Sequence, residues 1–353
     1  DPKDDTVKRV YLDWNATAPL RPEAREALIA AMDVTGNPSS VHAEGRVAKG
    51  MMERARAEVA SAFGADGADV VFLSGATEAA ALACAGRDLR GAAVEHDAVR
   101  AWIDAVLPVD AAGQVVVSDP ARTALQAANS ETGVIQELPQ GLAVVDATQA
   151  FGKIPFAFNW AGCTAALVSA HKLGGPKGIG ALVLRRGTDL SARMLGGGQE
   201  MGRRAGTENL IGIMGFAAAA LASQRDLEHG LWTKVEKLRN ILENVIADGA
   251  KETIFVGNSA SRLPNTSCFA LPGWKGETQV MQMDLAGFAV SAGSACSSGK
   301  LRPSEVLRAM GHDEETARSA IRVSLGPDVT EEDVLRFADA WLKQYRKYRA
   351  RGA

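Results

Sequence analysis

The sequence predicts an α/β protein in which a mainly parallel sheet, covered by helices on both faces, is followed by a smaller α+β domain. From about residue 22 to residue 190, helical patterns alternate with short runs of apolar residues. These runs are apolar on both faces, as is typical of parallel strands buried between two layers of helices. After about residue 224 the elements follow one another irregularly, which indicates a second domain that begins near Gly257.

The first part of the chain opens with two predicted helices. Pro22 is well placed at the first position of one helix, and the next runs from about Ala43 to Phe63 and ends at Gly64. A third helix is expected to begin at Ser74-Gly75-Ala76-Thr77-Glu78. Short apolar runs predict strands at Val70–Leu73, Ala92–Val94, Val115–Val117, Leu142–Val145, Ala165–Val168 and Ala181–Leu184.

The C-terminal part is predicted to consist of shorter elements. A long helix from about Gln224 to Ile246 leads into it, and the first residues of the chain are expected to pack with it. Strands are predicted at Thr253–Val256, Asn265–Leu271, Phe288–Ser291 and Ile321–Leu325, and helices at Glu277–Leu285, Ser304–Met310 and Glu331–Tyr345.

The composition is that of an ordinary globular protein and argues against two classes of function. Lysine plus arginine total 39 and aspartate plus glutamate total 42, a formal charge of -3, so the bulk charge does not favour direct binding of nucleic acid or of an anionic membrane. No segment approaches the ~18 consecutive apolar residues that span a bilayer. The polar N-terminus lacks the apolar core of a signal peptide, so we expect a cytoplasmic protein.

The four cysteines fit neither a zinc site nor a disulfide framework, and no metal is expected. Cys84, Cys163 and Cys268 have apolar neighbours and are predicted to be small buried core residues. Cys296 differs, because its setting, Ser294-Ala295-Cys296-Ser297-Ser298-Gly299, consists of small residues that cannot build a core. It is predicted to be exposed.

Chemically informative residues follow the predicted strands at their C-terminal ends, where α/β sheets bind ligands. Ser74-Gly75-Ala76-Thr77 offers a hydroxyl and backbone N–H groups that suit a phosphate, although Ser or Thr at a helix start is more often a plain N-cap. The later strands are followed by Glu95-His96, by Asp146 and Gln149, and by Ser169-Ala170-His171-Lys172. A lysine at the edge of a crevice can form a covalent bond with an aldehyde cofactor.

In chain order, these strand ends supply a phosphate cup, an imidazole, a carboxylate and a lysine. A carboxylate at the base of a pocket can pair with a protonated ring nitrogen, so together they match the needs of a pyridoxal-phosphate site. Nucleotide sites are not supported, because no GxGxxG follows a strand. The stretch from Gly293 to Lys300 also departs from a P-loop in its spacing and in the Leu301 that follows it.

Nearly end to end, the sequence resembles the cysteine desulfurases of the NifS/IscS type, within the class V, fold-type I pyridoxal-phosphate enzymes. The blocks that carry the resemblance are Tyr11-Leu12-Asp13-Trp14-Asn15-Ala16-Thr17, Gly36-Asn37-Pro38-Ser39-Ser40-Val41-His42, Ser74-Gly75-Ala76-Thr77-Glu78, Glu95-His96, Asn129-Ser130-Glu131-Thr132-Gly133, Asp146-Ala147-Thr148-Gln149, Ser169-Ala170-His171-Lys172, Gly206-Thr207-Glu208-Asn209, Gly293-Ser294-Ala295-Cys296-Ser297-Ser298-Gly299 and Ile321-Arg322-Val323-Ser324-Leu325-Gly326. Several blocks are weak alone, but so many in this order are specific.

The resemblance implies a mainly parallel, seven-stranded sheet in a large cofactor-binding domain at residues 15–257. It also implies a smaller α+β domain, at residues 1–14 and 258–353, that carries a mobile loop with the catalytic cysteine. In such an enzyme Lys172 would hold pyridoxal phosphate covalently, Asp146 would pair with its ring nitrogen and Gln149 would hydrogen-bond its ring hydroxyl oxygen. His96 would stack on the ring and pass protons near the substrate thiol.

The remaining cofactor contacts implied by the resemblance concern the phosphate. Its ligands would be the Ala76 backbone, Thr77, Ser169 and His171. The threonine that matches Thr207 reaches the phosphate of the neighbouring subunit in the family, which implies a homodimer with shared sites.

The substrate contacts implied by the resemblance are Arg322, which would clamp the carboxylate of L-cysteine in a bidentate pair, with Asn15 nearby. Ser130 stands where the family commonly has asparagine, in contact with cofactor and substrate; serine is shorter, so a water or Asn129 would have to substitute. Trp14 also departs from the common asparagine.

Cys296 would accept the substrate sulfur as a persulfide and pass it to an acceptor, either an Fe–S scaffold or a tRNA-thiolation relay. Its loop resembles the Ser-x-Ala-Cys-Ser-Ser-Gly group, and Lys300 and Arg302 nearby could favour the thiolate. Two alternatives stay open. One is a selenocysteine lyase or another class V enzyme, which would not need a mobile Cys296 loop, and the other is a non-catalytic scaffold.

Overall fold

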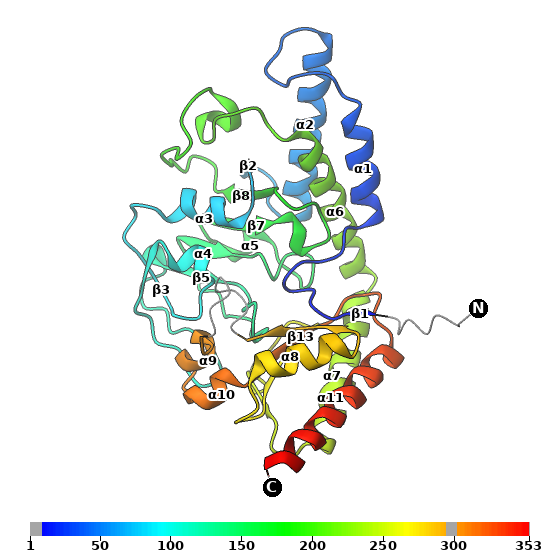
Figure 1. The fold of residues 1–353 in the computed structure, drawn as a ribbon. Helices are drawn as coiled ribbons and strands as arrows, with labels where there is room; N and C mark the ends of the chain where they lie inside the picture. Colours follow the sequence, from blue (N-terminus) through cyan, green and yellow to red (C-terminus); the bar gives the residue numbers. More distant parts are fainter. Residues whose placement is uncertain (1–8, 294–301, 353) are drawn as a thin grey trace, which may run out of the picture.

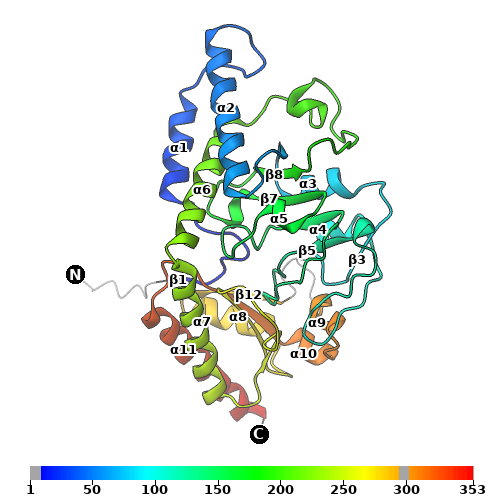
Figure 2. The ribbon, with the colours of Figure 1, turned by 180° about the vertical axis from the view of Figure 1, so that it is seen from behind.

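The computed structural model describes residues 9–293 and 302–352. Three long helices, α1 (Pro22–Met32), α2 (Ala43–Ala62) and α6 (Leu210–Glu228), lie side by side along one flank of the molecule (Figures 1 and 2). They cover one face of the central sheet, because the buried side chains of α2 and α6 join those of the strands in one apolar core.

The central sheet has the strand order β2-β8-β7-β6-β5. Its members are β2 (Asp69–Leu73), β8 (Gly180–Leu184), β7 (Ala165–Ser169), β6 (Val144–Asp146) and β5 (Ala124–Gln126). Within the described residues β8 is the one strand of this sheet that runs against its neighbours, while β5, β6 and β7 are parallel.

A parallel pair continues the sheet beyond β5. It consists of β3 (Leu89–Gly91) and β4 (Ile103–Ala105), and an isolated bridge joins Arg90 to Thr123, just before β5. The expected mainly parallel, seven-stranded arrangement is therefore confirmed as a five-stranded sheet with an adjoining two-stranded one.

Strand β7 shows why the strands of this sheet appear in the sequence as continuous runs of apolar residues. Ala166 and Val168 point into the core under α2 and α6, whereas Ala165 and Leu167 point into a second core under α3 (Ala76–Cys84). Both faces of the sheet are thus covered. The short helices of this part are α4 (Asp97–Arg100), α5 (Phe158–Ala161), η1 (Pro120–Arg122), η2 (Ala170–Lys172) and η3 (Gln199–Gly202).

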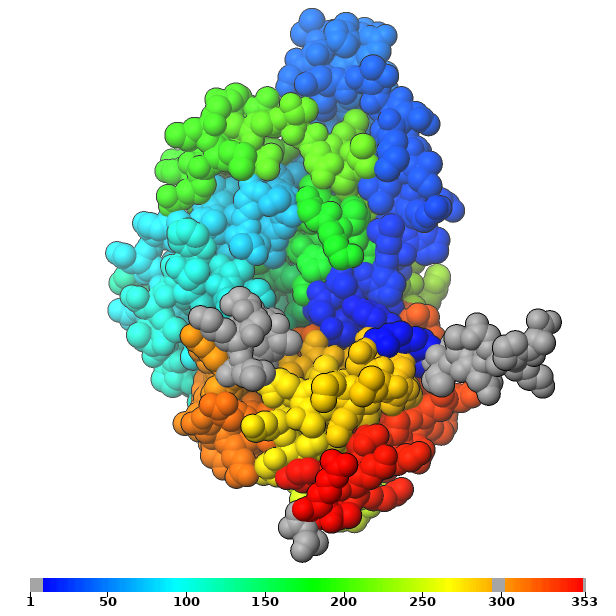
Figure 3. All heavy atoms as spheres, in the orientation of Figure 1, coloured from blue at the N-terminus to red at the C-terminus, as the bar shows by residue number. Residues whose placement is uncertain are grey.

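The C-terminal part contains an antiparallel sheet with the order β12-β13-β10-β9. Its strands are β12 (Ser291–Ala292), β13 (Ala320–Ser324), β10 (Thr266–Ala270) and β9 (Ile254–Phe255). The helices around it are α7 (Leu231–Gly249), α8 (Gly276–Leu285), α9 (Glu305–Ala309), α10 (Glu314–Arg318) and α11 (Glu331–Gly352). In Figure 3 the orange segment of α9 and α10 lies against the cyan segment that carries α4, and Arg100 of α4 pairs with Glu305 of α9.

The start of the chain packs with this C-terminal part, as the sequence predicts. Strand β1 (Val10–Tyr11) pairs in parallel with β11 (Phe288–Ala289), and Val10 and Leu12 join an apolar core with residues of α7, α8 and α11. Helix α7 contributes to this core although it precedes residue 257, where the sequence places the boundary. The domain division itself stays a prediction.

Four element predictions are wrong. The single strand predicted at Phe288–Ser291 is two strands, β11 and β12, which belong to different sheets. The strand expected at Ala92–Val94 lies three residues earlier, at β3, and Val115–Val117 holds only an isolated bridge from Val115 to Val109. The long helix from Gln224 to Ile246 is two helices, α6 and α7. Gly230 separates them in the left-handed conformation, with a φ of 68°, which is costly for a residue with a side chain.

Within the described ranges, every helix is too short or too polar to cross a membrane.

Candidate active site

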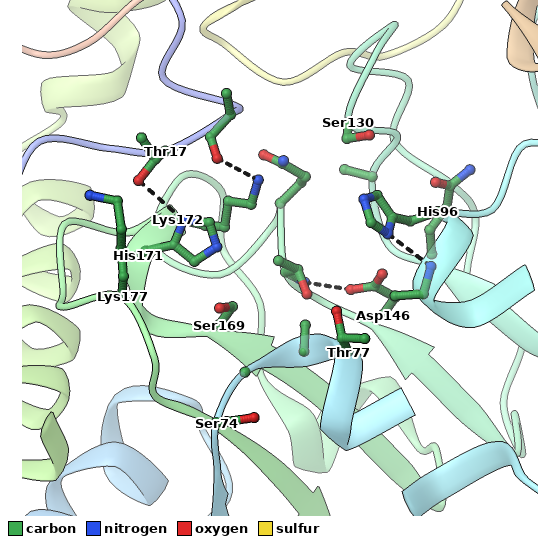
Figure 4. A pocket seen from close by; sticks show the side chains of 18 of the residues that line it. Thr17, Ser74, Thr77, His96, Ser130, Asp146, Ser169, His171, Lys172 and Lys177 are labelled. Atoms are coloured by element: carbon green, nitrogen blue, oxygen red, sulfur yellow. Dashed lines mark hydrogen bonds between the residues drawn. The ribbon is translucent and has the colours of Figure 1, made fainter. Parts of the chain in front are cut away.

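A cavity of about 600 Å³ opens where β2, β6 and β7 end, as expected for the C-terminal ends of such strands. In Figure 4, Lys172 and His171 enter it from one side, Asp146 and His96 from the other, and Thr77 from below. The lining residues are Ala16, Thr17, Ser74, Gly75, Ala76, Thr77, His96, Ala98, Gln126, Ala128, Ser130, Asp146, Thr148, Gln149, Ser169, His171, Lys172, Lys177 and Gly178.

One end of the cavity is suited to an anion. Helix α3 begins there, and its first internal hydrogen bond runs from the N–H of Ala79 to Gly75, so the N–H groups of the first turn are not used within the helix. Glu78 fixes this turn by accepting from the N–H of Ser74 at 2.7 Å and from Arg204 at 3.0 Å. A helix start with a threonine hydroxyl beside it is a favourable place for a phosphate.

Lys172 lies on the short helix η2, directly after β7. Its Nζ donates to the main-chain oxygens of Asn15 at 2.6 Å and of Ala16 at 2.8 Å. These carbonyls belong to the loop that follows Asp13, so the N-terminal segment holds the lysine amine at the edge of the cavity.

The carboxylate of Asp146 stands at the end of β6. Its Oδ1 accepts from the N–H of Thr148 at 2.9 Å, which fixes the side chain in the cavity wall. Thr148 lines the cavity, and its hydroxyl is buried without a hydrogen-bond partner among the described residues. An unpartnered polar group in the cavity wall is a candidate partner for a polar ligand.

The two histidines have different surroundings. Nδ1 of His96 accepts from the N–H of Ala98 at 3.1 Å, so the remaining proton lies on Nε2. Nδ1 of His171 lies 3.1 Å from the hydroxyl of Thr17. Burial, together with the nearby positive charges of Lys172, Lys177 and Lys153, lowers the pKa of His171 to about 4, so its imidazole is neutral near pH 7.

A buried polar network lies beneath Lys172 and centres on Asn15. Its Nδ2 donates to Thr266 at 2.8 Å and to the main-chain oxygen of Ser130 at 3.2 Å. Its main-chain oxygen accepts from Nε2 of Gln149 at 3.0 Å, and its Oδ1 accepts from Nζ of Lys153 at 3.0 Å. Asn15 thereby links the cavity to the C-terminal sheet.

Arg322 of β13 lines an adjoining cavity of about 140 Å³ together with His96, Ser130 and Glu131. Nη2 of Arg322 donates to Asp13 at 2.7 Å, and Nη1 donates to the main-chain oxygen of Ser130 at 3.0 Å. Its Nε is buried without a partner in the described part of the chain. The guanidinium is therefore fixed in place beside His96 and keeps a donor for a further acceptor.

Most of the residues that the sequence points to lie together. The cavity brings together Ala76, Thr77, His96, Ser130, Asp146, Gln149, Ser169, His171 and Lys172. Thr207 is exposed in a neighbouring hollow of about 240 Å³, which shares Ser74 and Gly178 with the cavity.

Asn129, a predicted substrate contact, does not line the cavity. Asn129 is buried, and its side chain holds the turn at residues 129–132, where it accepts from the N–H groups of Glu131 and Thr132. Cys296 lies outside the described residues. Cys84, Cys163 and Cys268 are buried, as predicted.

Sequence reasoning did not assign roles to Thr17, Thr148, Lys153 and Lys177. Thr17 and Thr148 belong to blocks that the resemblance rests on, but nothing in the sequence of these blocks shows that the two residues line the cavity. Lys153 follows Gln149 by four residues, but Gly152 between them adopts the left-handed conformation, so no helical pattern signals their contact.

Comparison with known proteins accords with this geometry. Residues 10–337 match the family aminotransferase class-V. A cysteine desulfurase from Cereibacter sphaeroides is 38% identical over 94% of this chain and 95% of its own length.

Solved structures agree. A NifS-like protein from Rickettsia africae ESF-5 superposes with a TM-score of 0.87 at 31% identity and covers 96% of this chain and 99% of its own. SspA, solved in complex with cysteine, superposes with a TM-score of 0.74 at 26% identity and covers 90% of this chain and 99% of its own. The chain therefore belongs to the class-V aminotransferase family, in the group of NifS/IscS-type cysteine desulfurases.

Proposed function

We propose that the protein uses pyridoxal phosphate to remove sulfur from L-cysteine, releasing L-alanine and leaving the sulfur as a persulfide on Cys296. The observation that carries this proposal is the meeting of the Lys172 amine, the Asp146 carboxylate and the start of α3 on one cavity. The SspA structure in complex with cysteine supports the choice of substrate.

The residues present fit pyridoxal phosphate. The start of α3, with Thr77 and Ser169, suits its phosphate, and neutral His171 can donate a hydrogen bond there without a charge. Lys172 suits its aldehyde, and Asp146 suits its ring nitrogen. The unpartnered hydroxyl of Thr148 is a further donor for a polar group of the cofactor.

When bound, pyridoxal phosphate supplies an electron sink for negative charge at the substrate Cα. The side chains around it would handle the substrate and its protons. Arg322 would hold the carboxylate through its remaining N–H groups, while Asp13 and the Ser130 carbonyl keep the guanidinium in place. The amine of Lys172 would accept the Cα proton, and Nε2 of His96 would exchange a proton with the substrate thiol.

Sulfur transfer would be carried out by Cys296. Its thiolate attacks the substrate sulfur, the Cβ–S bond breaks, and the electron pair of that bond stays with Cβ, which takes up a proton to give alanine. One thiol must reach the substrate and later an acceptor protein, so it needs a tether built from small residues. We propose an Fe–S scaffold or a tRNA-thiolation relay as the acceptor.

The active form is proposed to be a homodimer in which Thr207 reaches the cofactor phosphate of the partner subunit. The exposed position of Thr207 supports this, as do the exposed apolar side chains of Leu195 and Met201 on the same stretch of chain. A partner subunit would cover them.

The role of Cys296 is tested by replacing it with alanine. The Cys296→Ala protein should keep the visible absorption of bound cofactor but lose the persulfide label after incubation with labelled cysteine. Cys163→Ala is the matched control, because burial raises the pKa of Cys163 to about 12 and leaves it without thiolate at neutral pH. Persistent labelling of the Cys296→Ala protein would overturn the proposal.

The alternative is a selenocysteine lyase or another class V enzyme, which needs Lys172 and Asp146 but not Cys296. Measuring alanine released from cysteine and from selenocysteine by wild type and Cys296→Ala separates the two. If the protein is a desulfurase, the Cys296→Ala variant stops releasing alanine from cysteine. If it is a lyase that does not need Cys296, the variant releases as much alanine as wild type.

A further inference from the structure

Lys153 is a buried lysine that the chemistry described above does not use. It is 2% exposed and lies beneath the cavity, four residues after Gln149 along a turn. Its Nζ donates to Oδ1 of Asn15 at 3.0 Å and to Oε1 of Gln149 at 2.6 Å. Both acceptors are neutral amide oxygens. Burying an amine against such partners is unfavourable, so its presence calls for a role.

The charge of Lys153 is not needed for these hydrogen bonds. Burial lowers its pKa well below that of a free lysine, and the positive charges of Lys172 and Arg322 lower it further. A neutral amine still has two N–H groups, which is one for each amide oxygen. The contacts therefore persist whichever protonation state the amine adopts.

The amide of Gln149 can be oriented in two ways, and its neighbours allow one. The amine of Lys153 donates to Oε1, and the main-chain oxygen of Asn15, which can only accept, receives a hydrogen bond from Nε2 at 3.0 Å. Turned around, the amide would set its oxygen against the Asn15 oxygen. Gln149 lines the cavity and has a second N–H on Nε2, so in the observed orientation it can offer a donor there.

We propose that Lys153 is a positioning residue that orients the Gln149 amide so that an N–H, rather than an oxygen, meets the ring oxygen of pyridoxal phosphate. This inference rests on the proposed function, which places that oxygen beside Gln149. The same amine restrains Asn15, whose main-chain oxygen also accepts from Lys172. Lys153 thus stabilises both the hydrogen-bond donor to the ring and the resting position of the reactive amine.

The test is a double-mutant cycle with Lys153→Met, Gln149→Met and the double variant. Methionine removes the N–H groups of each side chain; it matches glutamine in length and is one atom shorter than lysine. We measure the dissociation constant for pyridoxal phosphate, the position of its visible absorption band, and the melting temperature of each cofactor-free protein.

If Lys153 acts through Gln149, each single variant binds the cofactor about tenfold more weakly, as expected for one hydrogen bond to a charged or polar oxygen. The band shifts in the same direction in both, and the double variant is no weaker than either single one. Cofactor binding by Lys153→Met equal to wild type, or losses that multiply to about a hundredfold in the double variant, overturns the inference.

Failure of the proposed function gives a different result, because the wild-type protein itself would then bind no pyridoxal phosphate. If Lys153→Met does not fold, as its melting curve would show, the cycle is run with Lys153→Gln. This variant keeps an N–H donor on a shorter chain and should lose less affinity than Gln149→Met. An equal loss overturns the inference.

Discussion

Replacing Glu200 with glutamine should destabilise the protein, because its carboxylate holds a long surface loop against the large core. Glu200 receives two hydrogen bonds from Arg56 of α2, at 2.7 and 2.8 Å, and one from the N–H of Phe72, at 2.8 Å. Burial disfavours the charge of Arg56. The hydrogen bonds and negative charge of Glu200 outweigh this effect, so the pKa of Arg56 is raised. Glu200 and Met201 also adopt left-handed backbone, with φ of 48° and 58°, which the contacts must offset.

The magnitude follows from burial. The Glu200 side chain is 1% exposed and that of Arg56 is 15% exposed, and removing one partner of a buried pair costs roughly 3–5 kcal/mol. Glutamine keeps one acceptor oxygen, and Arg56 keeps its contact with Glu53 at 3.2 Å. We therefore expect Glu200→Gln to lower the free energy of unfolding by about 3 kcal/mol, near the lower end of this range.

The assay is urea unfolding of the wild type, Glu200→Gln and the control Glu23→Gln. Glu23 pairs with Arg225 at 3.3 Å with both side chains about half exposed, so the same chemical change should cost less than ~1 kcal/mol there. Equal shifts in the free energy of unfolding for the two variants would refute the reasoning.

Two further predictions concern single groups in the site. The folded pKa of His171, about 4, lies below its usual value of 6.5, so the neutral ring stabilises the fold. Stability should then be full above pH 6.5 and fall between pH 6.5 and 4, and urea unfolding across this range should show a shallower fall in cofactor-free His171→Asn than in wild type. For Arg322→Lys we expect kcat/KM for cysteine to fall about 10- to 100-fold, mainly through KM, because lysine cannot hold Asp13, the Ser130 carbonyl and a carboxylate at once. An unchanged KM in steady-state kinetics would contradict the role given to Arg322.

The sequence predicted best what depends on local pattern. Strands β2, β7 and β8 are apolar on both faces and short, and their ends were predicted to within about one residue. Strands β4 and β5 have three residues each, too few for a period to emerge, and were missed. The break between α6 and α7 depends on one glycine, Gly230, in a sequence that otherwise continues a helical pattern.

The site was predicted through residues that follow strands, whereas its support comes from distant parts of the chain. The contacts of Asn15 with Lys153, Thr266 and Ser130 join segments more than a hundred residues apart, which no local pattern records. Trp14 is a similar case. Its ring packs on Gly326 so closely that a Cβ there would lie 1.8 Å from Cε2, which accounts for a glycine at that position.

The loop from Asp13 to Ala16 fixes the relative positions of two side chains of the site, Arg322 and Lys172. Asp13 accepts from Arg322, and the carbonyls of Asn15 and Ala16 accept from Lys172, so neighbouring residues of one short loop anchor both side chains. The distance between the guanidinium of Arg322, which would hold the amino acid's carboxylate, and the amine of Lys172, which would hold the cofactor's aldehyde, is thereby set by a covalent segment of four residues. Lengthening or shortening this loop would misalign both ends of a bound amino acid together, although none of its own side chains needs to take part in the reaction.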